Sequence, residues 1–136
     1  MKGKIFTRDD ATRMIPLLRR IATDTKACQK LIDRHERAIR ALKDRSGSKV
    51  DAELADHRAK LTQLAERQAS CAKELEELGC FLDDARQGIV KLYGEINSRI
   101  VYFTWMLGEP EVSFWHPIEK THTDRQPIAT ATNSST

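Results

Sequence analysis

The chain has 136 residues, of which 40% are hydrophobic, 32% charged and 6% aromatic, and its formal net charge is +3. This length allows one domain with a modest core, and a slight positive excess with both signs interspersed does not indicate a nucleic-acid-binding protein. No apolar run approaches the roughly 20 residues that cross a bilayer, and the three cysteines lack the spacing of a metal site, so we expect a cytoplasmic protein with reduced thiols.

The first helix is expected over residues 7–44, after a short lead-in that includes a candidate strand at residues 4–6. Thr7 followed by Asp10 resembles a capping box, in which the first side chain accepts a hydrogen bond from the backbone three residues later. Pro16 interrupts the pattern, because proline has no N–H to donate and its ring clashes with the preceding turn. Either the helix kinks there, or a short helix ends and a second begins with Pro16 in its first turn.

A second helix is expected over residues 50–78, after a polar turn at residues 45–49. In both helices the seam positions are separated alternately by four and three residues, which is the spacing of a coiled coil. If the chain folds back at the turn, the two seams pair antiparallel, and the paired residue numbers add to nearly the same value throughout. The sequence therefore predicts a long antiparallel α-helical hairpin. Its expected pairs, from tip to base, are Leu42 with Val50, Ile39 with Leu54, His35 with His57, Ile32 with Leu61, Cys28 with Leu64, Thr25 with Gln68, Ile21 with Cys71, Leu18 with Leu75 and Met14 with Leu78.

Two of these pairs are polar, namely His35 with His57 and Thr25 with Gln68. A polar layer in an apolar seam usually fixes the alignment of the helices at some cost in stability. A metal-binding or pH-sensing histidine pair is the alternative, but two histidines are too few ligands for a closed zinc site. We therefore favour the register-setting role.

Apolar and small side chains also lie beside the seam. Ala65, Ala69 and Ala72 form a stripe on the second helix, and Leu17 and Leu31 add apolar surface on the first. Two helices cannot bury both stripes, whereas a homodimer of hairpins or the C-terminal segment would cover them, and a different protein partner is a further candidate. The alternative is that alanine is simply a good helix former on an exposed face. Nucleic acid is not an expected partner, because acidic residues interleave with the basic ones at the hairpin tip.

At Gly79 the hydrophobic period changes from roughly 3.5 residues to 2, which predicts a small antiparallel β-meander over residues 79–116. The meander directly follows the second helix, so we expect it to pack at the base of the hairpin. Residues 117–128 are expected to be irregular, and residues 129–136 to form a disordered tail. The predicted fold is α+β, with residues 1–128 as a single domain. Its strands are expected at residues 80–82, 89–93, 100–107 and 112–115.

A distributed set of residues runs through the chain: Phe6, Thr7, Pro16, Gly79, Cys80, Asp84, Gly88, Trp105, Gly108, Glu109, Trp115, His116 and Arg125. Together they resemble the bacterial domain of unknown function 2203 family, most specifically over residues 105–110 and 114–116. The resemblance implies a small cytoplasmic bacterial protein with a helical hairpin and a β-meander, and it implies no activity. The chain departs from the family pattern at Asp83, where members often have lysine, at Lys91, where they often have aspartate, and at Thr104, where they often have cysteine.

The end of the meander and the segment after it hold the residues best suited to binding. Two tryptophans beside ionisable groups are able to wall a pocket. The candidate ligand-binding residues are Trp105, Glu109, Trp115, His116 and Arg125. A divalent metal is the one cofactor considered, because two histidines and a carboxylate are an accepted ligand set. Here the set is His116 and His122 with Asp124, or with Glu109 or Asp84 in its place. Their spacing matches no strong motif, and no catalytic residue is assigned.

Two functions remain open at this point. Large aromatic side chains usually belong to the core, so we favour a structural role for the tryptophan segment and a non-enzymatic interaction or scaffold module that acts as a helical-hairpin dimer. The alternative is a small-ligand or metal-binding protein, enzymes included, with its site around Gly108, Glu109, Trp115 and His116.

Overall fold

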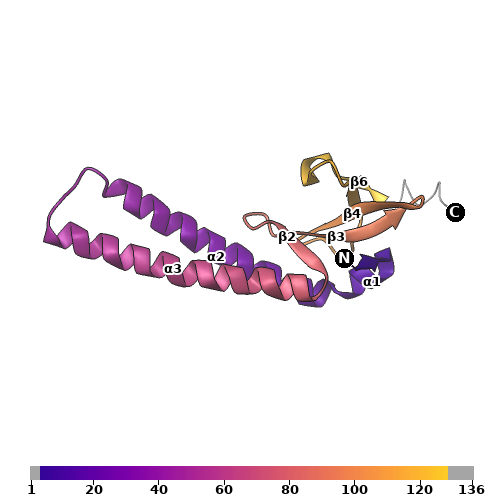
Figure 1. Ribbon diagram of the computed structural model, residues 1–136, viewed down its shortest axis with the longest axis horizontal. Coiled ribbons are helices and arrows are strands. Elements are labelled where there is room, and N and C mark those ends of the chain that lie inside the picture. The colour runs from indigo at the N-terminus through magenta and orange to yellow at the C-terminus, as the bar shows by residue number, and fades with distance from the viewer. Residues whose placement is uncertain (1–3, 129–136) are drawn as a thin grey trace.

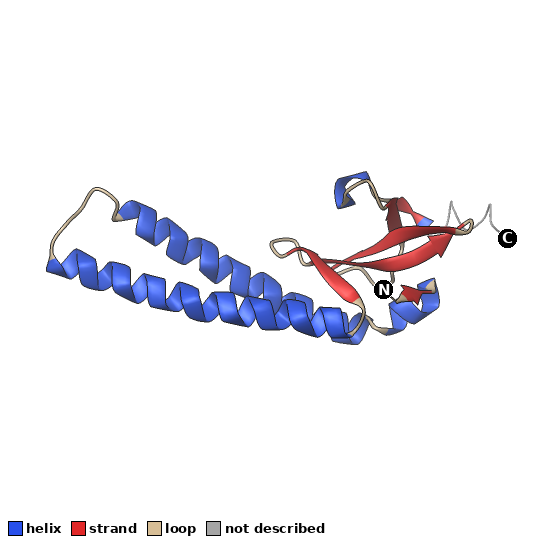
Figure 2. Cartoon of the chain, in the orientation of Figure 1, coloured by secondary structure: helices blue, strands red, loops and turns tan. Residues whose placement is uncertain are grey.

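A computed structural model describes residues 4–128 and contains helices together with a mixed sheet (Figure 1, Figure 2). In chain order the elements are β1 (Ile5–Phe6), α1 (Arg8–Arg13), α2 (Ile15–Ala41), α3 (Ser48–Glu77), β2 (Cys80–Asp84), β3 (Ile89–Ile96), β4 (Arg99–Met106), β5 (Phe114–Pro117), the 3₁₀ helix η1 (His122–Asp124) and β6 (Gln126–Pro127). The predicted α+β class is confirmed. The predicted tail at residues 129–136 lies outside the described residues.

The segment expected as one helix over residues 7–44 consists of two helices, α1 and α2, which meet at Met14. Thr7 caps α1 as predicted, because its hydroxyl accepts a hydrogen bond of 3.0 Å from the backbone N–H of Asp10. Pro16 lies in the first turn of α2, where a residue without an N–H loses no helical hydrogen bond. The sequence left open whether Pro16 kinks one helix or lies at the start of a second, and the structure has two separate helices.

Helices α2 and α3 run antiparallel and form a long hairpin whose tip lies far from the sheet (Figure 1). Two contacts confirm the expected register between them. The Nδ1 atoms of His35 and His57 are 2.9 Å apart, and the thiol of Cys28 donates to the carbonyl oxygen of Leu64 at 3.1 Å. The turn lies at residues 42–47, slightly earlier than the predicted 45–49, because α2 ends at Ala41 and α3 begins at Ser48. The alternating spacing was nevertheless sufficient to align two helices of 27 and 30 residues.

The second polar pair of the hairpin differs from the expectation. The side-chain amide of Gln68 donates to Gln29 at 2.8 Å instead of to Thr25. The hydroxyl of Thr25 is buried and has no hydrogen-bond partner among the described residues. Gln29 lies one turn further along α2, and its longer side chain reaches across the seam where the threonine hydroxyl does not.

Burial is uneven along the hairpin. Its base is packed into the domain core, whereas no side chain in residues 29–41 or 51–70 is fully buried. The exposed large apolar residues include Leu17 and Leu31 on α2, with 41% and 38% of their surface accessible. The outer part of the hairpin is therefore a pair of helices with a half-covered seam.

The sheet corrects the prediction of a purely antiparallel meander. Strands β2 to β6 pair antiparallel, but β1 pairs parallel with β3, with Ile5 opposite Tyr93 and Phe6 opposite Gly94. β2 covers the first half of the same edge of β3, and β1 continues that edge. A strand of two residues shows no alternation, so the sequence carried no signal for its direction.

Strand β3 is longer than expected, because it continues through Gly94 to a two-residue turn at Asn97 and Ser98. Both turn residues have positive φ angles, 53° and 65°, as a tight hairpin turn requires. Gly94 is required by packing: a Cβ atom there would lie 2.3 Å from the ring of Phe103 on β4. Gly94, which resembles a loop residue in the sequence, thus lies within β3 where the ring of Phe103 packs on the strand.

Strand β5 begins later than the expected residue 112. The backbone of Val112 is bonded to α1 instead of to a strand: its N–H donates to the hydroxyl of Thr12 at 3.1 Å, and its carbonyl accepts from Arg8 at 2.9 Å. The segment after β5 was expected to be irregular, and it contains η1 and the short β6. These contacts fix residues 112–127 against both α1 and the sheet.

The two faces of the sheet have different environments. The inner face packs on α1 and on the hairpin base, and its buried apolar residues are Cys80, Val90, Leu92, Ile96, Val101, Phe103 and Trp105. The outer face carries polar and aromatic side chains that the next section describes. No helix among residues 4–128 has both the length and the apolar content to cross a membrane.

Candidate functional site

The turn at Gly108 and Glu109 is held by contacts that the residues make with each other. The backbone N–H of Met106 donates to the Glu109 carboxylate at 2.9 Å, and the indole N–H of Trp105 donates to the Glu109 carbonyl at 2.8 Å. Trp105 is completely buried in the core. Trp105 and Glu109 are therefore close together, as predicted, but each satisfies the other within the fold.

Arg125 completes this cluster and is fully engaged. Its guanidinium donates to the Glu109 carboxylate and contacts the hydroxyl of Thr104 at 3.4 Å. The same guanidinium lies 4.0 Å from the centre of the Phe114 ring. Only 14% of the Arg125 side chain is exposed, so this candidate ligand-binding residue attaches the segment after β5 to β4 and its turn.

Trp115 and His116 are neighbours on β5 and point to opposite faces of the sheet, as successive strand residues must. Trp115 packs against the core, whereas His116 pairs with Tyr102 of β4 on the outer face, with ring centres 5.5 Å apart. His116 is 1% exposed, and its Nδ1 lies 2.7 Å from the carbonyl of Pro117. A carbonyl only accepts, so Nδ1 carries a proton and donates it. The remaining Nε2 is buried and has no partner among the described residues.

The metal set expected from His116, His122 and Asp124 is not assembled. Across residues 4–128 no group of three or more histidine, cysteine, aspartate or glutamate side chains is arranged to hold a metal ion. Asp124 is exposed, in the same 3₁₀ helix as His122. Because η1 turns His122 toward β2, its acidic neighbours come from that strand instead.

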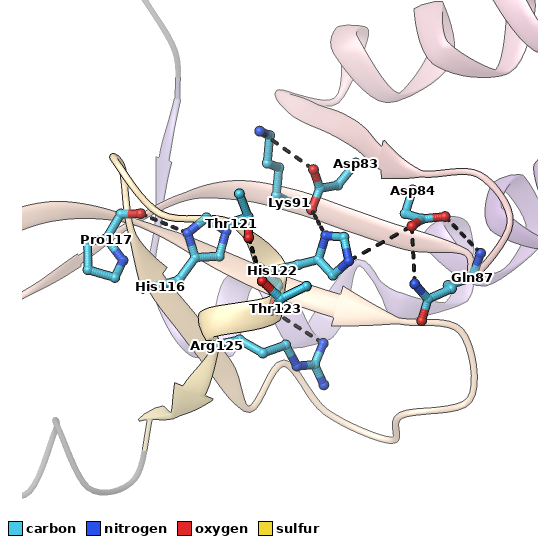
Figure 3. A network of polar contacts seen from close by, with 11 residues as sticks. Asp83, Asp84, Gln87, Lys91, His116, Pro117, Thr121, His122, Thr123 and Arg125 are labelled. Carbon is cyan, nitrogen blue, oxygen red and sulfur yellow. Dashed lines mark hydrogen bonds and ion pairs between the residues drawn. The ribbon is translucent and has the colours of Figure 1, made fainter.

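On the outer face of the sheet, His122 is part of a cluster of ionisable side chains, which Figure 3 shows. The Nδ1 atom of His122 is 3.1 Å from the carboxylate of Asp83, and its Nε2 atom is 3.9 Å from the carboxylate of Asp84. Lys91 of β3 approaches the other oxygen of Asp83 at 3.8 Å and lies 4.4 Å from the centre of the Tyr102 ring. All of these ionisable side chains are only 18–27% exposed, so the cluster is half-buried.

Asp83 and Lys91 were missing from the predicted site. The sequence did contain a signal for them, because a β-hairpin closed at residues 85–88 places the end of β2 beside the start of β3. The signal was not decisive, since many strand ends carry charged residues.

The pKa shifts of Asp84 and Tyr93 move both groups away from neutral pH, so neither is suited to exchange a proton there. Burial alone would raise the pKa of Asp84, but hydrogen bonds from the backbone and side chain of Gln87 and from the Arg86 backbone, together with nearby His122, lower it overall. A hydrogen bond with Tyr102, followed by burial, raises the pKa of Tyr93. These groups keep their ordinary charge at neutral pH, and Tyr93 stays protonated.

Burial of the cysteines disfavours thiol chemistry. The three cysteines are buried and unpaired within residues 4–128, and burial raises the pKa of Cys80 to about 12. A thiol reacts as its thiolate, so Cys80 is inert at neutral pH.

The remaining concave surfaces lie mainly along the hairpin. One groove on the outer hairpin has a volume of about 260 Å³ and is lined by Leu31, His35, Lys60, Gln63, Leu64 and Arg67. A second, of about 370 Å³, lies at the tip. Both combine apolar side chains of the seam with basic residues.

Comparisons with known proteins identify a family and no relative of known role. The family described as "Uncharacterized conserved protein (DUF2203)" matches residues 4–128. No curated protein and no solved structure matches the chain.

Proposed function

The chain belongs to the uncharacterized DUF2203 family, and from its geometry we propose that it is a non-enzymatic protein-interaction module whose helical hairpin pairs with that of a second copy. The observation that carries this proposal is the half-covered seam of the outer hairpin. Apolar residues there, such as Ile32, Leu61 and Leu64, are only partly buried in the single chain. Seam residues at coiled-coil spacing gain stability when another helix pair covers them.

The site residues give a second line of support. Glu109, Arg125 and Trp105 are bonded to one another and to the sheet, so they stabilise the fold and offer little to a ligand. Leu17 and Leu31 on the hairpin are exposed, as are Ile5, Ile100 and Ile118 on or beside the sheet. The hairpin carries two of these five exposed residues, so its half-covered seam remains the observation on which the proposal rests.

The hairpin is large enough for a stable interface. Its longer helix, α3, has 30 residues and so extends about 45 Å. A standard interface buries about 800 Å² on each partner, which one side of such a hairpin supplies. Two hairpins side by side form a four-helix bundle in which each half-covered seam becomes a core, and we propose a coiled-coil arrangement of this kind.

Native mass spectrometry and analytical ultracentrifugation of the full chain test the proposal. We expect a dimer of the 15.5 kDa chain for the wild type and a monomer for Leu31→Glu, because a carboxylate would then have to be removed from water in the interface. Ile100→Glu is the matched control: Ile100 is 41% exposed, close to the 38% of Leu31, but lies on the sheet. It should leave the dimer intact. A wild type that stays monomeric at its highest soluble concentration contradicts the proposal.

One observation favours the second candidate function, a ligand or metal site on the outer face of the sheet. The Nε2 atom of His116 is buried without a partner among the described residues, and an unpaired buried acceptor is costly unless something binds it. If this function is correct, native mass spectrometry with added Zn²⁺ should give one ion per chain. That ion should be lost in His116→Ala and kept in His35→Ala. Equal binding by both variants rejects the site.

A further inference from the structure

The hairpin tip holds a groove with an apolar floor and a basic rim, which we call the tip groove. The floor consists of Ile39 and Leu42 from the end of α2 and its turn, and Leu54 from α3. The rim consists of Arg40, Lys43, Arg45 and Arg58, and the volume is about 370 Å³. Space of this size accommodates a few side chains of a partner and is too small for a large ligand.

The charged residues that line the tip groove are all basic, although acidic residues such as Asp44 and Asp51 lie close to them in the sequence. No acidic residue lines the groove, and within residues 4–128 none of its four cations forms an ion pair with a carboxylate. Asp56 is close in sequence to Arg58 but pairs with Lys60 at 3.5 Å. Four unpaired cations around one groove make its potential positive, and such a potential attracts and orients an acidic partner.

The apolar floor determines which acidic partner fits best. Nucleic acid would place phosphates on the rim, but it would bring no apolar group to the floor, and no aromatic residue lines the groove for base stacking. An amphipathic helix that carries leucines on one side and glutamates beside them matches both the floor and the rim. This is the usual way in which a helix is recognised in a groove.

We propose that the tip groove binds an acidic amphipathic helix of a partner protein, with leucine side chains on Ile39, Leu42 and Leu54 and carboxylates on the basic rim. The inference deepens the proposed function: it rests on the hairpin being the interacting element, and it does not depend on dimerisation. It is local to the tip, whereas the proposed dimer is centred on Ile32, Leu61 and Leu64 of the outer hairpin, which do not line the tip groove.

Fluorescence anisotropy with the full chain tests this inference. The probe is a labelled helical peptide with leucines at i, i+3 and i+4 spacing and glutamates at the flanking positions. We expect micromolar binding that weakens as salt is added, because exposed charge pairs are screened. A second peptide, in which glutamine replaces each leucine, should bind about tenfold more weakly, because the floor then contacts polar groups. A single-stranded oligonucleotide of equal charge should bind more weakly than the leucine peptide.

Charge-reversal variants locate the binding surface. Arg40→Glu and Arg58→Glu should each weaken binding about tenfold, because attraction at the rim becomes repulsion. Arg37→Glu is the matched control, since Arg37 is an exposed residue of the same helix and does not line the groove. It should change binding less than twofold, and circular dichroism should show that all three variants stay folded.

The outcomes separate this inference from the dimer proposal. Loss of binding in the rim variants but not in Arg37→Glu supports the tip groove, whether the protein is a monomer or a dimer. No binding, equal effects of all three variants, or tighter binding of the oligonucleotide overturns it, even if the protein is a dimer. A monomer that binds the leucine peptide overturns the dimer alone.

Discussion

Arg125 shows how a side chain suited to ligand binding is used by the fold itself. Its planar guanidinium reaches Glu109 and Thr104 and stacks on Phe114, so its hydrogen-bonding capacity serves the end of the domain. The Glu109 carboxylate in turn accepts from the backbone of Met106. A buried ion pair with these additional bonds is costly to break, because the remaining charge stays buried without its partner.

We predict that Arg125→Ala lowers the free energy of unfolding by about 2–4 kcal/mol. Arg99→Ala is the matched control, because the ion pair of Arg99 with Glu119 has a separation of 3.9 Å and both side chains are about two-thirds exposed. That change should stay within about 0.5 kcal/mol. Urea denaturation followed by circular dichroism measures both. Equal small effects would mean that the Glu109–Arg125 pair is not structural.

The outer-face cluster contains an ion pair between two neighbouring strands. Asp83 at the end of β2 approaches Lys91 of β3 to 3.8 Å, and only 18% and 27% of the two side chains are exposed. A half-buried pair of this kind neutralises the charge of Asp83 and joins β2 to β3, so it favours a structural role for this carboxylate.

The sequence predicted which site residues lie close together, but it did not predict which of their polar groups bind one another. Trp105, Glu109 and Arg125 were expected together and lie together, because the turn after β4 and the segment after β5 return to the same place. The sequence does not reveal whether polar groups satisfy one another, since that depends on distances of a few tenths of an ångström. His116 and His122 both lie on the outer face of the sheet. His122 points toward Asp83 because it belongs to a 3₁₀ helix, and that helix is too short to produce a periodic pattern in the sequence.

At the scale of elements, the histidine pair forms a polar layer within the hairpin seam. His35 and His57 share one hydrogen bond of 2.9 Å between their Nδ1 atoms, so one ring must donate and the other accept. Such a layer stabilises less than an apolar layer of similar volume, but a wrong register leaves both rings unpaired.

We predict that the double variant His35→Leu, His57→Leu raises the free energy of unfolding by about 1–2 kcal/mol, because an apolar layer replaces a polar one. Each single variant should be less stable than the double variant, because it leaves one imidazole facing a leucine. A double-mutant cycle from thermal denaturation gives the coupling between the two positions. Additive effects of the single variants would show that the two rings do not interact.

The elements that were predicted well are those with many repeats of one signal. Nine seam pairs all indicated the same antiparallel register, so errors at single positions such as Thr25 did not matter. The elements that were predicted poorly depend on single contacts. β1 has two residues, and β5 starts late because Val112 is bonded to Thr12 and Arg8. Long-range hydrogen bonds of this kind connect residues about a hundred positions apart, and no local pattern encodes them.

The whole molecule consists of a well-packed end and an exposed end. The sheet, α1 and the hairpin base share one core, while the outer hairpin extends from it with partly covered seam residues (Figure 1). An isolated pair of helices gains little from burial, so an extended hairpin of this length is best stabilised by association. Protein concentration should therefore affect its stability.

We predict that the melting temperature of the wild type rises by about 2–3 °C for each tenfold increase in protein concentration, as expected when a dimer of this size unfolds to two chains. Leu31→Glu should melt lower and independently of concentration, because the charge prevents pairing of the hairpins. Ile100→Glu should keep the concentration dependence, because Ile100 lies on the sheet. Differential scanning calorimetry over two decades of concentration measures all three. A wild type whose melting temperature does not move with concentration would mean that the hairpin is stable alone, and the half-covered seam would then need an explanation within the single chain.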